Sequence, residues 1–364
     1  FYGIMQQGGF DVIIGNPPWR EYAAVRRDYL VQDYVTEKCG NLYGLCIERG
    51  LSLRDQAQGR LGYIVQLPLM SSSRMAGVRT LLQRESGSLY FIPFDDRPGK
   101  LFDGLQHCRS VIFLSSGRGD SGHSLFVAGY QRWPTGTRQY LFAQLGFVIV
   151  EGDSIYPSRF PKYASATHSS LFAKVRAKGD RLLGTLLRSK TTGHFVFYQE
   201  ATQYWVKATV GLPYYAKNGK VGAPPHGRYL HLGDGHTAYM VCALLSSSLF
   251  YVYFVTYGDC FHLSDNLVSG FPLAARIPDD QRLADLGRRL MDDLASNAER
   301  ITIRTSSGDE ISYAEFYGAR SKPIIDEVDR LLAQHYCFTK DELDFILNYD
   351  IKFRMATSDP TLSD

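Results

Sequence analysis

The sequence lacks the cysteine patterns of zinc-binding and disulfide-linked proteins. Six cysteines are scattered over 364 residues, and no two of them form a C-x-x-C pair. We therefore expect reduced thiols and a cytoplasmic protein. Most of the nine histidines lie in the middle of the chain, without carboxylates at metal-ligand spacing. The sequence predicts no metal site.

A convincing membrane span is also missing. The stretch Thr237–Tyr257 has no charged residue and is about long enough to cross a bilayer. Three serines, 246–248, interrupt it, and no cluster of Lys or Arg flanks either end. We expect a buried core helix here and no membrane partner.

The chain has no strong net charge, but its charge is unevenly distributed. Its formal charge is +3, whereas residues 121–276 carry 15 basic and 7 acidic side chains together with 13 of the 24 tyrosines. Residues 277–364 carry 11 basic and 18 acidic side chains. A basic region rich in aromatics favours a polyanion with stackable bases, although a merely solvated basic face gives the same count.

The most informative segment is Asp11–Trp19, an apolar strand that runs into Asn16-Pro17-Pro18-Trp19. An exocyclic amine is a poor nucleophile until acceptors engage its two hydrogens. The Asn16 side-chain oxygen and the Pro17 carbonyl would supply both acceptors. Two prolines fix φ and carry no N–H, which keeps these groups out of helical bonding. Trp19 offers a face on which a planar substrate can stack. The simpler alternative is that Pro-Pro only ends a buried strand.

The order of expected elements predicts an α/β protein. Strands at 61–65, 89–94 and 110–114 alternate with helices at 41–53 and 71–83, and 21–34 reads as an exposed helix or lid. This alternation is typical of a doubly wound sheet. From 123 to 235 short β-prone runs dominate, and apolar and charged helices follow. We expect a catalytic part at 1–118, a mixed α+β target-recognition domain at 119–276, and C-terminal helices at 277–364 that pack on it.

The segment around Asn16 closely resembles motif IV of amino-methyltransferases that use S-adenosylmethionine. Further segments resemble γ-type N6-adenine DNA methyltransferases of the type IIG restriction–modification methylase family. Residues 41–49 are similar to motif V, residues 59–65 to motif VI, and residues 100–104 followed by 109–114 to motif VIII. Residues 243–251 and 271–273 are similar to the recognition domain of that family. Residues 322–330, 338–343 and 348–354 are similar to its C-terminus. In motif VI, Gln66-Leu67 intervene before Pro68 where the family pattern continues directly into proline.

The resemblance implies a function and site residues. It implies a partial S-adenosylmethionine-dependent methyltransferase sheet and methylation of a flipped adenine in double-stranded DNA, with no metal needed. Asn16, Pro17, Pro18 and Trp19 would form the catalytic loop, and Trp19 would stack on the base. An aromatic of motif VIII would contact the other face of the base. The motif points to Phe102, with Phe94 as an alternative and an ordinary core role open for Phe102.

A cofactor loop of the F-x-G-x-G kind, expected upstream of the catalytic loop in this family, is absent from the sequence. Gly117-Arg-Gly119 and Gly233-Asp-Gly235 are the nearest patterns, and both lie in the wrong place. We therefore expect a fragment of a longer enzyme that is inactive alone, with unknown cofactor-binding residues. Two alternatives stay open: a non-catalytic DNA-binding or specificity module, and an amino-methyltransferase acting on RNA or protein glutamine.

Overall fold

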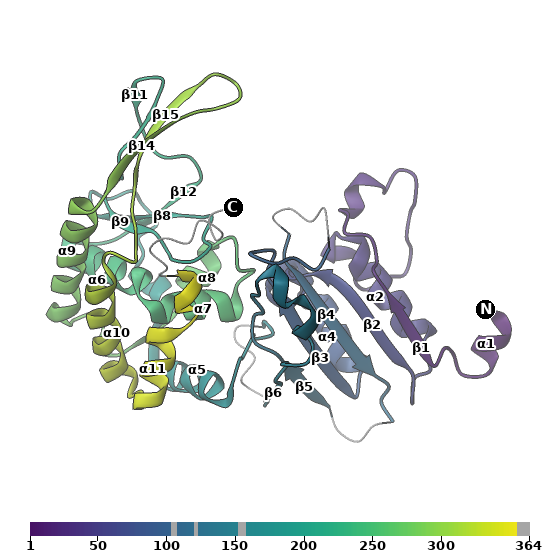
Figure 1. Ribbon diagram of the computed structural model, residues 1–364. Coiled ribbons are helices and arrows are strands. Elements are labelled where there is room, and N and C mark those ends of the chain that lie inside the picture. The colour runs from purple at the N-terminus through teal and green to yellow at the C-terminus, as the bar shows by residue number, and fades with distance from the viewer. Residues whose placement is uncertain (103–107, 120–122, 152–157, 355–364) are drawn as a thin grey trace. The chain divides into compact units, whose positions relative to one another are not determined.

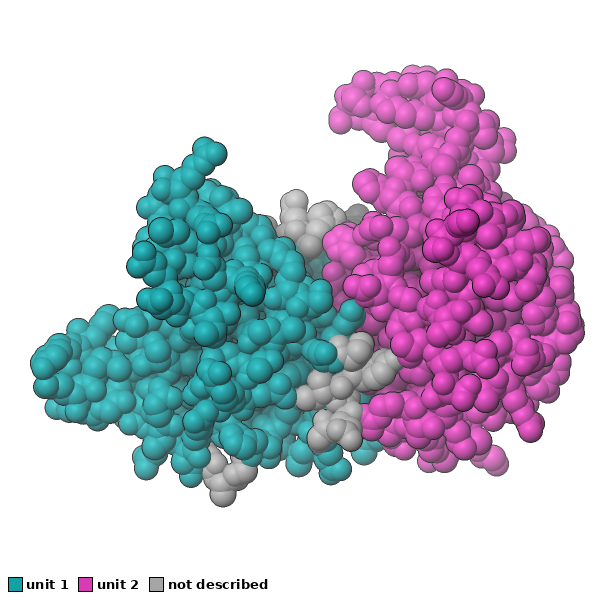
Figure 2. Space-filling view, turned by 180° about the vertical axis from the view of Figure 1, so that it is seen from behind, with its two compact units in different colours: residues 1–169, 364 teal, residues 170–363 magenta. Residues whose placement is uncertain are grey.

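The computed structural model describes residues 1–102, 108–119, 123–151 and 158–354, which form two compact units, residues 1–169 and 170–363 (Figures 1 and 2). The expected boundary at 118/119 lies inside the first unit, and that at 276/277 lies inside the second. Part of the Gly-rich run at 117–122, residues 120–122, falls outside the described residues.

The first unit contains one sheet and a few short helices. Its elements are α1 (Tyr2–Gln6), β1 (Val12–Gly15), η1 (Tyr22–Ala24), η2 (Glu37–Cys39), α2 (Leu42–Leu53), β2 (Arg60–Gln66), α3 (Pro68–Ser71), η3 (Ser73–Met75), α4 (Ala76–Glu85), β3 (Ser88–Phe94), β4 (Ser110–Ser116), β5 (Ser124–Val127), η4 (Thr135–Tyr140) and β6 (Val148–Val150). The helix α5 (Ala166–Lys178) crosses into the second unit.

Six strands form the sheet of the first unit, in the order β1-β2-β4-β3-β5-β6. The pairs β1–β2 and β3–β5 are parallel, and the other three pairs are antiparallel. The expected α/β class is confirmed, with a mixed sheet. Because β5 and β6 pair onto β3, this unit continues to Ser169 instead of ending at 118.

One face of this sheet is covered by helices. Phe91 and Phe113 on that face are fully buried, and their rings stack with centroids 5.8 Å apart. Helix α2 approaches Tyr63 on the same face at Gly50, where a Cβ atom would lie 2.8 Å from the Tyr63 hydroxyl. Only glycine allows this close approach. Helices α2 and α4 also contact each other, so both belong to this layer.

The other face carries an exposed apolar row. The strand registers align Ile14, Gly62, Leu114, Tyr90, Phe126 and Ile149 across the sheet. Ile14 is 79% exposed, Ile149 54% and Leu114 46%. Strands whose two faces are both apolar are typical of sheets buried on both sides. The described residues cover only one face of this sheet.

The second unit combines small sheets with longer helices. Its elements are β7 (Gly179–Leu182), η6 (Leu183–Leu186), β8 (Phe195–Gln199), β9 (Ala208–Val210), β10 (Tyr215–Lys217), β11 (Lys220–Val221), β12 (Gly227–His231), α6 (Gly235–Ser246), α7 (Ser248–Tyr257), α8 (Asp265–Ser269), β13 (Pro272–Ala274), α9 (Gln281–Ser296), β14 (Glu299–Arg304), β15 (Glu310–Glu315), α10 (Lys322–Tyr336), α11 (Lys340–Asn348) and α12 (Ile351–Arg354).

The strands and helices of this unit lie at different ends. The sheet β12-β8-β9 and the four-stranded arm β11-β10-β15-β14 are at one end, and the hairpins of the arm project from it (Figure 1). Helices α9 and α10 contact α6, and α10 also contacts α7. Leu290 of α9 and Ile325 of α10 pack with Trp205 in one buried cluster. Residues 277–354 therefore share a compact unit with β8–β12.

The apolar stretch 237–257 forms two helices instead of the expected one. Ser247 ends α6 and caps α7 through its hydroxyl, which accepts from the Phe250 N–H. Asp329 of α10 accepts from the N–H groups of Ser248 and Leu249 at 3.1 and 3.0 Å. Among the described residues, no single helix has the length and composition of a membrane span, and only this pair passes together, bent by 62°.

Other sequence expectations have mixed outcomes. Asn41 caps α2 at the start of the expected helix 41–53, and Thr339 caps α11 in a capping box with Glu342. The expected helix at 71–83 is divided into α3, η3 and α4, and 21–34 is mostly irregular with only the turn η1.

The buried His168 makes the first unit sensitive to acid. Its Nδ1 accepts from the Ala164 N–H at 3.1 Å, and burial lowers the pKa of His168 from 6.5 to about 3. Below about pH 6.5 the His168 imidazole is protonated in the unfolded chain, whereas it stays neutral in the folded chain. Stability is therefore complete above about pH 6.5 and falls as the pH drops toward 3, by about 2 kcal/mol between pH 7 and pH 5 for this group.

His168→Asn keeps an acceptor and does not titrate. We expect urea unfolding from pH 7 to pH 5 to show a decrease in stability smaller by about 2 kcal/mol in this variant than in the unmodified chain. Equal decreases in the two proteins would contradict the assignment.

Candidate functional site

The candidate site lies at one edge of the first sheet. Strands β1 and β2 are parallel and both run antiparallel to β4, as does β3. The carboxyl ends of β1, β2 and β3 therefore meet at the same edge, where β4 begins. Asn16, Leu67 and Asp95 follow these three strands, and Arg109 directly precedes β4.

The Asn16 loop, residues 16–19, leaves the sheet without regular structure. Asn16 and Pro18 are exposed, and Pro17 is buried. Among the described residues, no hydrogen bond occupies the Asn16 amide or the Pro17 carbonyl. Two acceptors predicted from the sequence are thus adjacent and available at the edge of the sheet.

Trp19 is held in place by β2. Strand β1 ends at Gly15, opposite Tyr63, so no residue of β1 pairs with Ile64. The Trp19 Nε1–H donates to the Ile64 carbonyl instead, at 3.3 Å. The ring is half-buried, which leaves part of its surface accessible next to the loop.

The chain after the loop is tied to the start of α2. The Leu42 N–H donates to the Arg20 carbonyl at 2.9 Å, and the Tyr22 N–H donates to the Gly40 carbonyl at 2.8 Å. Glu21 forms an exposed ion pair with Arg74 at 2.7 Å. These contacts fix where the Asn16 loop ends.

A buried charge cluster lies at the same edge. Arg132 Nε is 2.6 Å from Asp95 Oδ2, and Arg109 lies 3.4 Å from Asp95 and 3.3 Å from Asp96. Burial would raise the pKa of Asp95, but Arg132 and Arg109 outweigh it and hold the pKa below its usual value. Burial raises the pKa of Asp96, against the opposing effect of Arg109. Sequence reasoning missed this cluster, although Asp-Asp directly after a strand was a visible signal.

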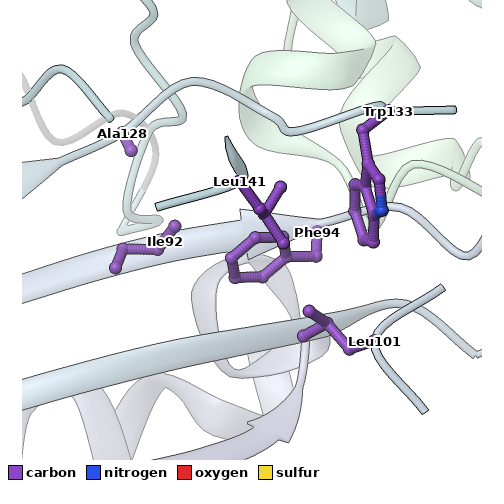
Figure 3. Packing of buried hydrophobic residues seen from close by; sticks show 6 residues of the cluster. All are labelled: Ile92, Phe94, Leu101, Ala128, Trp133 and Leu141. Atoms are coloured by element: carbon purple, nitrogen blue, oxygen red, sulfur yellow. The ribbon is translucent and has the colours of Figure 1, made fainter. Parts of the chain in front are cut away.

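The two candidate base-stacking aromatics differ in burial. Phe94 is fully buried, in a cluster with Trp133 and Leu101 (Figure 3). Phe102 is only partly buried and packs against this cluster. Arg138 donates to the Lys100 and Leu101 carbonyls at 3.0 and 2.6 Å, which anchors the segment before Phe102. Of the two rings, Phe102 is the one with surface left for a ligand.

The motif that pointed to Phe102 is described only in part. Its Asp103 and Gly104 lie outside the described residues. The role of Phe102 stays a prediction.

The glycine pairs do not form a cofactor cradle. A Cβ on Gly117 would lie 2.4 Å from the Ala57 carbonyl, so this glycine packs on backbone. Gly233 faces Arg188, and Asp234 caps α6 through the Thr237 N–H at 2.7 Å. The residues present therefore do not fit the main loop for S-adenosylmethionine. Within the described ranges, no three His, Cys, Asp or Glu side chains gather as a metal site would require.

A family model matches the part of the chain that builds this edge. Residues 1–97 match the model of the Eco57I restriction-modification methylase family, and the match includes β1, the Asn16 loop, β2 and β3. No curated protein matches the chain.

Solved structures of restriction–modification enzymes align with this chain. The type IIL enzyme MmeI in complex with DNA aligns over 94% of this chain and 57% of its own, with 8% identity and a TM-score of 0.53. The DrdV–DNA complex aligns over 94% and 56%, with 11% identity and a TM-score of 0.41. A nuclease-deletion mutant of the type ISP enzyme LlaGI with a DNA substrate mimic aligns over 84% and 39%, with 12% identity and a TM-score of 0.43. The chain thus covers between 39% and 57% of these structures, and the likeness to MmeI shows a shared fold.

The charge cluster gives a matched pair of variants. Asp95→Asn leaves two buried guanidinium groups short of their shared carboxylate, and we expect it to lower the free energy of unfolding by about 3 kcal/mol or more. Asp96→Asn removes a carboxyl that burial already disfavours as an anion, so its effect should stay below about 1 kcal/mol. Chemical unfolding of both variants measures the difference, and similar losses would refute it.

Proposed function

We propose that these residues are part of an enzyme that methylates adenine N6 at specific sites in double-stranded DNA, within a restriction–modification system. The main support is a pair of hydrogen-bond acceptors at the carboxyl end of β1, Asn16 Oδ1 and the Pro17 carbonyl, which accept no hydrogen bond from the described residues. The match of residues 1–97 to a restriction-modification methylase family supports the reaction class.

In the proposed mechanism, the target adenine leaves the helix and its N6 hydrogens are bound by the two acceptors. Unstacking a base costs a few kcal/mol, which aromatic contacts in the site help to offset. Trp19, fixed by Ile64, stacks on the base, and Phe102 contacts it from the other side. Fixed acceptors favour the positive charge that grows on N6 as it attacks. The donor, S-adenosylmethionine, supplies the methyl group.

We further propose that the described residues do not complete this reaction alone. The absence of an F-x-G-x-G loop from the sequence and the packed position of Gly117 support this view. The same facts favour the second candidate, a non-catalytic DNA-binding or specificity module. Calorimetry of the chain with S-adenosylmethionine should show no binding, and measurable affinity would overturn this part of the proposal.

The acceptor pair is tested by Asn16→Ala in a form of the enzyme that is competent for methylation. Since the Asn16 amide makes no hydrogen bond among the described residues, unfolding should change by less than about 0.5 kcal/mol. Methylation should fall at least 100-fold, the scale reported when a fixed polar group is removed from an active site. DNA binding should persist.

Mass spectrometry of digested DNA identifies the product of the same assay. N6-methyladenine is expected, and its loss should accompany Asn16→Ala. Full activity of the variant would refute the role of Asn16. Methyl groups found in RNA or on protein glutamine would instead favour the alternative substrate class.

DNA binding is proposed for the basic strand-rich end of the second unit. Arg188 and Lys190 are exposed, and no ion pair engages them in the described part of the chain. Arg188→Ala/Lys190→Ala should weaken binding to random-sequence duplexes and reduce the slope of log K against log salt by about two. The matched control is Arg289→Ala/Arg320→Ala, whose arginines pair with Glu327 and Glu299. Equal effects of the two pairs, measured by fluorescence anisotropy, would contradict the assignment.

A further inference from the structure

A cavity of about 330 Å³ lies beneath the arm of the second unit, between β8–β9 and β10–β15. Its walls are mostly aromatic rings and prolines, among them Phe197, Tyr214 and Tyr313. A second cavity of about 350 Å³ adjoins it and shares Ala201 and Lys207 with it. Preformed apolar cavities with a few polar groups are the usual form of small-ligand sites.

Two of the aromatic walls are held rigidly. A Cβ on Gly227 would lie 2.0 Å from the Phe197 ring, so the ring lies directly across the β12 backbone. Tyr229 meets the same ring edge-on at 5.4 Å. The Arg300 guanidinium lies 3.8 Å from the centroid of the Tyr214 ring, which fixes that wall from the arm. The cavity therefore needs little rearrangement to receive a flat ligand.

Polar groups with free hydrogen-bonding capacity line the same cavity. Within the described residues, the side chains of Gln199 and His226 have no hydrogen-bond partner. His226 has a left-handed backbone, with φ at 57°, which is uncommon outside glycine and recurs at functional sites. Lys207 and Glu315 form an ion pair at the wall. An amide, an imidazole and an ion pair offer both donors and acceptors to the edge of a heterocycle.

The strands around the cavity carry a small positive charge. Residues 188–231, which include β8 to β12, contain six Lys or Arg and one carboxylate, Glu200, whereas residues 299–315, which form β14 and β15, contain two Arg and four carboxylates, for a net charge of +3. Lys207, Lys217 and Arg228 are already paired with carboxylates. A flat heterocycle with hydrogen-bonding edges that is attached to negative charge is a nucleotide. Stacking on aromatic side chains together with a basic surface is the general means by which proteins hold single bases.

We propose that this cavity binds one unstacked nucleobase. The inference rests on the proposed function of DNA binding by this unit, and it adds a base site separate from the Asn16 loop. Two sources share this chemistry: an extrahelical base of the bound DNA, and a free nucleotide.

The test blocks the cavity at its rim. Ala201 is exposed and borders both cavities, so Ala201→Trp fills the space without disturbing the core. Ala177→Trp, at an exposed position of α5, is the matched control. Gln199→Leu removes the free amide at nearly constant volume and serves as the second variant if Ala201→Trp fails to fold.

The first probe is a pool of random-sequence duplexes with 5-iodouracil in place of thymine. Irradiation links this base to aromatic rings on which it stacks, and peptide mapping locates the links. We expect links at Tyr214 and Tyr313 that fall at least tenfold in Ala201→Trp and stay unchanged in Ala177→Trp. Retention of the pool, measured separately, should fall less than threefold.

The second probe is free dAMP and dTMP, observed by saturation-transfer NMR. Binding that Ala201→Trp abolishes, without links from the duplex pool, supports the cavity with a free nucleotide as its ligand. Links confined to other parts of the unit, together with no effect of Ala201→Trp on free nucleotides, would overturn the base site while DNA binding stands. A pool that is not retained at all refutes the DNA-binding function instead, and nucleotide binding then decides the cavity by itself.

Discussion

The candidate site depends on the pairing of β1 with β2. Strand β1 has four residues, and its register places Gly15 opposite Tyr63, with a ring atom of Tyr63 3.3 Å from the position of a Cβ on Gly15. Because pairing stops there, the next carbonyl of β2, that of Ile64, is free to accept from Trp19. The end of one short ladder therefore fixes both the direction of the Asn16 loop and the position of its aromatic. A shift of one residue would turn every side chain of β1 to the other face.

Charge fixes the other half of the same edge. Asp95 directly follows β3, Arg109 directly precedes β4, and Arg132, from the segment after β5, also pairs with Asp95. Such a buried network adds little net stability, but breaking it is costly, so it defines a single arrangement of the strands. The segment that leads to Phe102 starts from this network. The prolines thus restrict the backbone of the Asn16 loop, whereas the ion pairs of Asp95 hold the start of the segment that leads to Phe102.

Helix caps lie within a few residues of the helices that they begin, whereas other contacts join residues far apart in the sequence. Asn41 and Thr339 mark the starts of their helices in the sequence, because the side chain of a capping residue accepts from a backbone N–H two or three residues further on. The break at Ser247 depends also on Asp329, about 80 residues away, whose burial raises its pKa to about 6. The membership of β5 and β6 in the first sheet likewise depends on pairing with β3. The same division applies to the site: Asn16 and Trp19 were visible in one motif, whereas Arg132 and Ile64 become partners only through the fold.

The uncovered face of the sheet bears on the same site. Ile14 is the most exposed member of the apolar row, and it lies in β1, two residues before Asn16. Burial of apolar area stabilises by about 25 cal/mol per Å², so a surface that covers this row gains free energy and comes to lie beside the two acceptors. Ile14 and Asn16 are two residues apart, so a protein surface that buried Ile14 would also adjoin the Asn16 side chain.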